Sequence, residues 1–320
     1  MSDSQDSRLA HFPVTFFAIT MGLGGLTLAF HAAGHAVPWS HMAFNVMLVV
    51  TLAVFATISA FYVTKWLRHG AAARGEWHHP VKIAFFPTIA ISILLMSTAL
   101  TGINKDIALW VWAVGAAAQF VLTIAVISSW IDKTHYAQGH LTPAWFIPAV
   151  GNVIVPLAGV PLGFPEISWY FFAVGVTFWI ILLTLVFNRL VFHDPIPARL
   201  FPSLVILIAP PAVAFVSWVR LTGEIDAFAR ILLNAGYFFA ALNIVQVPKL
   251  AKLPFALSFW ALSFPLAALT VASFLFGRET GSNIHTGIGL ALLALLTVTV
   301  AGLALRTLKA IARNEICKPE

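Results

Sequence analysis

A phenylalanine beside a proline, in the middle of a long apolar run, has the clearest chemical consequence in this sequence. The run from Leu253 to Phe276 can cross a bilayer, at about 1.5 Å per residue against about 30 Å of hydrocarbon, yet it contains Phe264-Pro265. Proline removes a backbone donor and clashes with the carbonyl four residues earlier, and lipid cannot satisfy the freed group. We therefore expect this helix to face a bundle interior or a pore, with Phe264 as an apolar plug. The alternative is an aromatic side chain packed in the core.

Hydroxyl, amide and glycine positions in the other broken helices complete the candidate path. No Asp, Glu, Lys, Arg or His lies in the middle of an apolar run, which argues against a proton- or sodium-coupled carrier and favours passive conduction. Broken helix ends carry partial positive charge, which favours an anion. The alternative for each hydroxyl is a bond to a backbone carbonyl or a neighbouring helix. The sequence predicts pore-lining or kink positions at Gly22, Gly25, Pro87, Thr88, Pro148, Asn152, Pro210, Ser263 and Pro265, and pore-mouth charges at Lys82 and Arg220.

The composition places these residues in a membrane. Hydrophobic residues make up 60% of the 320 residues and charged residues only 9%, far from the roughly 25% charged of a soluble domain. The net charge of +6 comes from basic residues scattered in short loops, so it does not predict nucleic-acid binding. The sequence therefore predicts an all-α integral membrane protein in contact with lipid.

Ten apolar spans follow a leader at 1–11 and precede a tail at 313–320. Interior prolines, or glycines in the first span, occur in every second span, which predicts five helical hairpins around a central pore, each with one kinked inner helix and one regular outer helix. Residues 12–312 then form one membrane domain. The predicted spans are 12–31, 41–66, 80–101, 107–131, 143–161, 166–192, 201–221, 226–247, 253–276 and 285–307.

The basic residues predict the orientation of these spans. With the N-terminus inside, fourteen of the 18 Lys and Arg residues fall on the cytoplasmic side. This bias exists only for an even number of spans. We therefore expect both termini, including the flexible leader, to be cytoplasmic.

Histidines raise the alternative of a redox or metal protein. His31, His35 and His41 cluster in one loop and His78-His79 precede the third span. Intramembrane haem proteins pair histidines within the bilayer, and this loop cluster lacks a carboxylate that would orient a ligand. The sequence therefore predicts no metal and no cofactor.

Several short stretches, taken in order, resemble the tellurite-resistance/dicarboxylate transporter family, which includes bacterial TehA and the plant guard-cell slow anion channels. They are His79-Pro80-Val81-Lys82, Phe146-Ile147-Pro148-Ala149-Val150, Tyr170-Phe171-Phe172, Leu207-Ile208-Ala209-Pro210-Pro211 and Trp260-Ala261-Leu262-Ser263-Phe264-Pro265. The resemblance implies ten helices as five hairpins, a homotrimer with one pore per subunit, and a place in the bacterial inner membrane. It also implies that Phe264 occludes the pore as a gate.

The resemblance leaves the transported species open among small inorganic and carboxylate anions. The first hypothesis is an anion channel and not an enzyme. The alternative is an efflux carrier for tellurite, sulfite or C4-dicarboxylate anions. A basic residue at mid-depth of a span would favour this alternative, and the sequence has none there.

Overall fold

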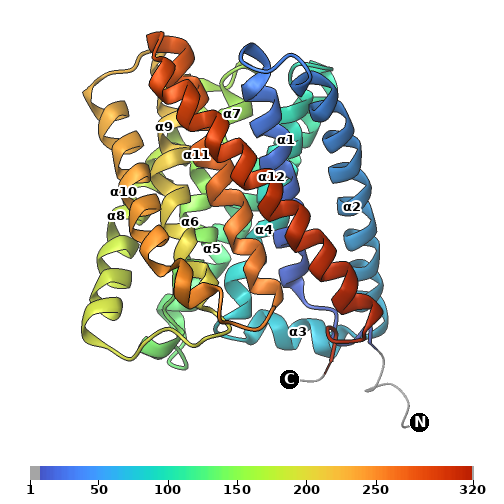
Figure 1. The fold of residues 1–320 in the computed structure, drawn as a ribbon. Helices are drawn as coiled ribbons and strands as arrows, with labels where there is room; N and C mark the ends of the chain where they lie inside the picture. Colours follow the sequence, from blue (N-terminus) through green and yellow to red (C-terminus); the bar gives the residue numbers. More distant parts are fainter. Residues whose placement is uncertain (1–7, 319–320) are drawn as a thin grey trace.

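Apolar helices make up the protein. The computed structural model describes residues 8–318, and no strand occurs among them. The leader predicted at 1–11 and the tail predicted at 313–320 therefore fall partly outside the described residues. Within residues 8–318, nine segments are long and apolar enough to cross a membrane (Figure 1): Val14–His35, Ser40–Arg68, Lys82–Leu100, Lys105–Asp132, Pro165–Phe192, Phe201–Thr222, Ala227–Leu250, Leu257–Thr280 and Asn283–Ala312.

The span predicted at 143–161 is a shorter apolar segment, Pro143–Gly159. It is divided into η5 (Pro143–Trp145), α6 (Phe146–Val150), η6 (Gly151–Ile154) and α7 (Pro156–Gly159). Pro148 in α6 and Pro156 at the start of α7 prevent one continuous helix, because each proline lacks a backbone N–H donor. The span predicted at 253–276 also differs, because its helical segment starts with a 3₁₀ stretch at Leu257 and continues to Thr280.

Burial alternates along the chain. Four spans have 72 to 83% of their most apolar window buried, whereas the five between and after them have 22 to 33%. The outer helices are α2 (Ser40–Arg68), α5 (Lys105–Asp132), α8 (Pro165–Phe192), α10 (Ala227–Leu250) and α12 (Asn283–Ala312). The inner segments are η1-α1-η2 (Val14–Phe16, Phe17–Ala32, Ala33–His35), η3-α4 (Lys82–Phe85, Pro87–Leu100), the divided segment Pro143–Gly159, η7-α9 (Phe201–Ile208, Ala209–Thr222) and η8-α11 (Leu257–Leu262, Ser263–Thr280).

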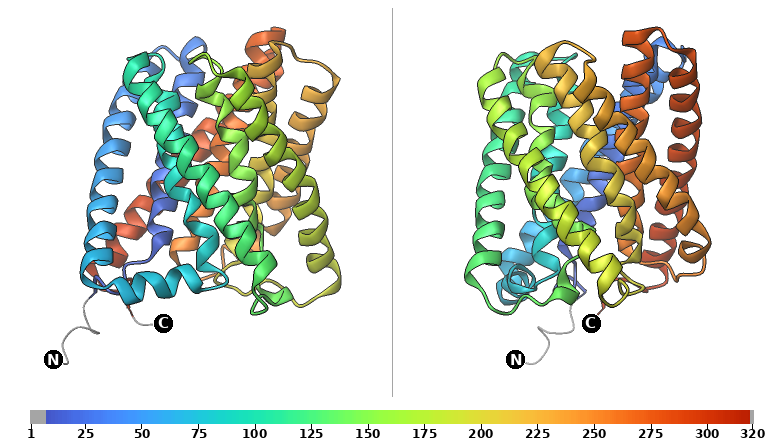
Figure 2. Two further views of the ribbon diagram at one scale, coloured as in Figure 1. Left: turned by 180° about the vertical axis from the view of Figure 1, so that it is seen from behind. Right: turned by 90° about the vertical axis from the view of Figure 1, so that its left-hand side faces the viewer.

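The inner segments contact one another around a closed ring. Helix α1 packs against α4 and α11, α11 packs against α9, and the divided segment contacts both α9 and α4. Each inner segment also packs against the outer helix that follows it: α1 on α2, α4 on α5, α6 and α7 on α8, α9 on α10, and α11 on α12. The views in Figure 2 show this bundle from two further sides. Helix α1 begins and α12 ends at the same end of the molecule (Figure 1).

The interior prolines lie where a 3₁₀ stretch changes to an α-helix. Pro87 and Pro156 are the first residues of α4 and α7, Pro210 is the second residue of α9, and Pro265 is the third residue of α11. The first N–H groups of an α-helix have no partner within that helix, so proline costs little there. In η3-α4, η7-α9 and η8-α11 the break therefore divides the segment into a 3₁₀ part and an α-helical part at little cost in hydrogen bonds.

A short helix that the sequence analysis did not predict, α3 (Gly70–His78), follows α2. It lies across the end of the bundle at which α1 begins (Figure 1). Its Ala73 and Glu76 are buried while most of its other side chains are not. This helix packs against α2 and against η3, which starts the second inner segment.

Candidate functional site

Two apolar cavities lie inside the ring of inner segments. The first encloses about 40 Å³ and has walls from all five inner segments. It lies at the level where the 3₁₀ stretches change to α-helix. Its lining residues are Met21, Ile91, Phe146, Ile147, Val150, Gly151, Val153, Ile154, Ile206, Ala209, Pro210, Val213, Ala261, Phe264 and Pro265.

The second cavity encloses about 30 Å³ and also takes walls from all five inner segments. It lies against the α-helical parts of these segments. Its lining residues are Gly25, Leu28, Leu95, Leu157, Val213, Val216, Phe264, Ala267, Ala268 and Val271. The side chains of both walls are apolar, so neither cavity contains a fixed charge that would hold an ion.

Phe264 forms part of the wall of both cavities. It is the second residue of α11, next to the change from η8, and its side chain is 8% exposed. It is the α11 side chain that the two linings have in common.

The predicted polar lining residues bond to the backbone instead of lining a cavity. Thr88 Oγ1 donates to the Phe85 carbonyl at 2.5 Å, and Ser263 Oγ donates to the Trp260 carbonyl at 2.6 Å. Asn152 Nδ2 donates to the Ala149 carbonyl at 2.7 Å. Each of these bonds reaches back three residues near a change between 3₁₀ and α-helix, where carbonyls lack regular partners.

The other predicted site residues occupy three kinds of position. Gly25, Pro210 and Pro265 line a cavity with Phe264, whereas Pro87 and Pro148 lie in broken helical turns outside both linings. Gly22 lies against Ser263. Lys82 opens η3, and the exposed Arg220 lies near the end of α9, so these two charges are at opposite ends of the inner segments.

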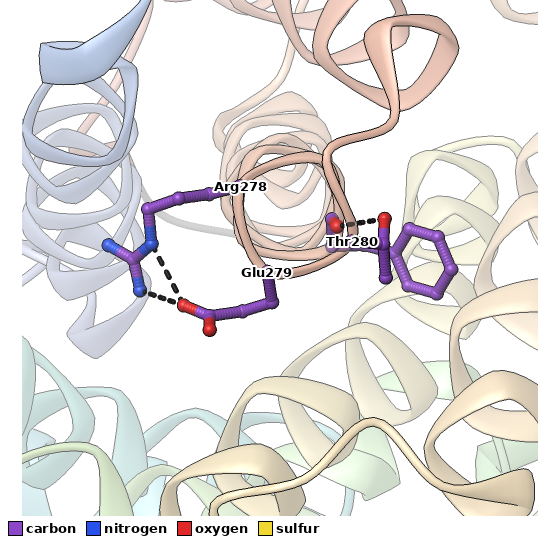
Figure 3. A network of polar contacts seen from close by, with 4 residues as sticks. Arg278, Glu279 and Thr280 are labelled. Carbon is purple, nitrogen blue, oxygen red and sulfur yellow. Dashed lines mark hydrogen bonds and ion pairs between the residues drawn. The ribbon is translucent and has the colours of Figure 1, made fainter.

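Charges gather near Arg220 where α11 ends. Arg278 and Glu279 form an exposed ion pair, with Nη2 to Oε1 at 2.7 Å, and Arg220 interacts electrostatically with both. Figure 3 shows this pair beside Thr280, whose hydroxyl donates to the Phe276 carbonyl. Among residues 8–318, no group of three or more His, Cys, Asp or Glu side chains is placed to hold a metal ion.

A polar network on α5, not singled out from the sequence, satisfies the broken fifth segment. The Pro148 carbonyl accepts hydrogen bonds from Thr123 Oγ1 at 2.8 Å and from Gln119 Nε2 at 3.1 Å. Asn152 Nδ2 donates to Thr123 Oγ1 at 3.0 Å. The available signal was the spacing of Gln119 and Thr123, four residues apart on one face of an apolar helix.

A buried ion pair, also not predicted, fixes α3 to the first inner segment. Lys65 Nζ lies 2.9 Å from Glu76 Oε2, and the side chains are 1% and 7% exposed. Lys65 Nζ also donates to the Phe12 carbonyl at 2.9 Å, and Tyr62 donates its hydroxyl to Glu76 Oε2 at 3.0 Å. The network therefore joins α2, α3 and the residues before η1.

Gly22 allows α1 to approach α11 closely, and Gly22→Ala tests this contact. An added Cβ would lie 2.8 Å from Ser263 Cβ and 3.2 Å from Trp260 Cε3. We expect the free energy of unfolding to fall by about 1–3 kcal/mol, the usual cost of overpacking. Thermal unfolding in detergent measures the change. Gly302→Ala is the matched control, because its added Cβ on α12 would meet nothing within 4 Å; equal effects of the two substitutions would contradict the close approach.

Comparison with known proteins connects this architecture to ion transport. A family model described as voltage-dependent anion channel matches residues 11–308. The tellurite resistance protein TehA homolog of Haemophilus influenzae is 24% identical over 95% of this chain and 92% of its own length. An uncharacterized transporter of Methanocaldococcus jannaschii, MJ0576, is 25% identical over 99% of this chain and 98% of its own. The S-type anion channel SLAH3 of Arabidopsis thaliana is 23% identical over 96% of this chain, which spans only about half (49%) of that protein.

Proposed function

The chain belongs to the SLAC1 family of voltage-dependent anion channels, whose model covers nearly all of it, and we propose that it is an anion channel closed by Phe264. The observation that carries the proposal is the Phe264 ring in the wall of both cavities within the ring of inner segments. The family resemblance predicted from short motifs is confirmed. Anion transport across a membrane is the activity that this membership supports.

The proposed architecture has ten membrane crossings, arranged as five hairpins around one pore. The fifth crossing is the segment Pro143–Gly159, which has 17 residues. A 3₁₀ stretch rises about 2.0 Å per residue against about 1.5 Å in an α-helix, so this mixed segment extends roughly 28–30 Å, close to the hydrocarbon thickness. Ten crossings also agree with α1 beginning and α12 ending at one end of the molecule.

Both cavities contain apolar side chains and no ionisable group, which supports passive permeation. An ion bound through a fixed charge would have to lose that contact in every transport cycle. An apolar constriction instead closes a pore by excluding water from it. The proposal therefore assigns control of permeation to the phenyl ring of Phe264, which blocks water.

The proposal includes a homotrimer with one pore per subunit, in an inner membrane, with both termini cytoplasmic. The trimer follows the family resemblance, and the orientation follows the Lys and Arg distribution. Exposed apolar side chains along the outer helices, such as Met42, Trp110 and Val298, suit contact with lipid or with another subunit. Chemical cross-linking in native membranes tests the oligomeric state.

The activity itself is tested with the purified protein in planar bilayers. We expect a small current whose reversal potential follows the chloride or nitrate gradient and is unchanged when potassium replaces sodium. The alternative, an efflux carrier for tellurite, sulfite or C4-dicarboxylate anions, predicts uptake into liposomes that saturates and is accelerated by the same anion on the opposite side. Such counterflow without current would overturn the channel proposal.

A further inference from the structure

Only two of the residues that line the cavities are common to both. They are Phe264 on α11 and Val213 on α9, a helix that packs directly against α11. Val213 is the fifth residue of α9 and is 4% exposed. The boundary between the two cavities therefore has two side chains, one from each of two neighbouring inner segments.

The Phe264 ring also lies against α1. A Cβ added at Gly25 would lie 3.3 Å from Phe264 Cδ2 and 2.7 Å from the Ala267 Cβ. The glycine therefore lets the ring occupy space that any other residue on α1 would take. Gly25 lines only the second cavity, so it lies beside the Phe264 side chain and is not part of the boundary shared by the two cavities.

We propose that Val213 is the second half of the gate, the surface against which Phe264 closes, so that residue 213 sets how tightly the resting pore is sealed. The inference rests on the proposed anion channel function and extends it to a second gate residue. Valine suits this role because a β-branched side chain in a helix has one strongly preferred rotamer and so presents a fixed surface. Its two methyl groups also keep the narrowest part of the path apolar, which excludes water and ions.

The first test is Val213→Ala, recorded as anion current in planar bilayers. Shortening the side chain widens the boundary on its α9 side, opposite Phe264 on α11. We expect conductance to rise by about three- to tenfold, because a tenfold rate change needs only a small reduction of the barrier. Val213→Thr keeps the shape and adds a hydroxyl group that water can contact, so it should also raise conductance.

Val219→Ala is the matched control. Val219 lies six residues further along α9, is 8% exposed and lines neither cavity. The same two methyl groups are removed from the same helix, at a position away from the shared boundary. We expect its conductance to stay within about twofold of the wild type, since sites about one and a half helical turns apart act independently.

The second test moves the ring across the boundary. In Phe264→Ala/Val213→Phe the ring comes from α9 instead of α11, and we expect at least about tenfold less conductance than in Phe264→Ala alone, a strongly non-additive result. Phe264→Ala/Val219→Phe should stay open, because residue 219 lines neither cavity. Size-exclusion profiles and thermal unfolding confirm that each variant is folded before its current is compared.

The outcomes separate the two proposals. If Phe264→Ala opens the pore while Val213→Ala and Val213→Thr behave like Val219→Ala, the role of Val213 is overturned and the channel proposal stands. If Phe264→Ala leaves the current unchanged, both the gate and its second half are overturned. Recovery of closure in Phe264→Ala/Val213→Phe supports the two-residue gate.

Discussion

Phe264→Ala is expected to raise anion conductance at least about tenfold, the largest change that any single substitution in the pore should produce. The ring lies in the wall of both cavities inside the ring of inner segments. Removing it joins these cavities and leaves a wider path that water can fill. Phe264→Leu should give an intermediate conductance, because a branched aliphatic side chain closes less of the same boundary.

Phe274→Ala is the control for this measurement. Phe274 is a buried phenylalanine on the same helix, but its ring packs on Gly289 of α12, where an added Cβ would lie 2.8 Å from Phe274 Cδ1. Loss of this ring lowers stability, by about 3–5 kcal/mol for a buried phenylalanine, without changing the boundary between the cavities. An unchanged current in folded Phe264→Ala protein, recorded in planar bilayers with nitrate or chloride, contradicts the gate.

The prolines allowed the inner segments to be predicted from sequence alone. Pro87, Pro210 and Pro265 each lie in a mostly buried span, while the outer helices α2, α5, α8 and α12 contain no interior proline. The outer helix α10 departs from the predicted alternation, because it continues past the predicted span end at 247 and includes Pro248 in its last turn. The reason is general, because lipid cannot satisfy a broken backbone whereas neighbouring helices can. The place of the break was less predictable. The structure changes from 3₁₀ to α-helix at these residues, and this puts proline in a first turn where its missing donor costs little.

The hydrogen-bond partners of the polar side chains could not be predicted in the same way. Thr88 and Ser263 lie on inner segments, as expected, but their hydroxyls bond to carbonyls three residues earlier. A short hydroxyl side chain can reach its own backbone from almost any helical position, so sequence cannot separate this bond from a lining role. The α5 residue Gln119 shows the converse, because a polar group on an outer helix satisfies a broken inner one.

Helix α3 escaped prediction because residues 66–80 contain charged residues, histidines and glycines typical of a loop. Its contribution depends on one pair, Lys65 and Glu76, which are separated by eleven positions and by the end of α2. Opposite charges at this spacing are common in sequences and do not by themselves indicate burial. Only the fold places Glu76 against Lys65 and Tyr62.

Lys65→Met is expected to lower the free energy of unfolding by about 3–5 kcal/mol, the range for breaking a buried ion pair by removing one partner. Both side chains are less than a tenth exposed, so water cannot replace the lost ammonium. The substitution removes the ammonium that pairs with Glu76, leaves the Tyr62 hydroxyl donating to that carboxylate, and removes the bond to the Phe12 carbonyl. Thermal unfolding in detergent, supported by denaturant titration, measures the loss.

The double substitution Lys65→Met/Glu76→Leu separates the cost of an unpaired charge from the value of the pair itself. It removes both charges, so we expect it to recover much of the stability that Lys65→Met loses. Arg313→Met is the control for removing a cation, because its pair with Glu315 spans 4.0 Å and both side chains are more than half exposed; such pairs contribute little. Equal stability of Lys65→Met and Arg313→Met would contradict the buried pair.

Because the Phe12 carbonyl directly precedes Pro13 and η1, loss of Lys65 should also loosen the start of the first inner segment, and hydrogen exchange of residues 14–20 would detect this.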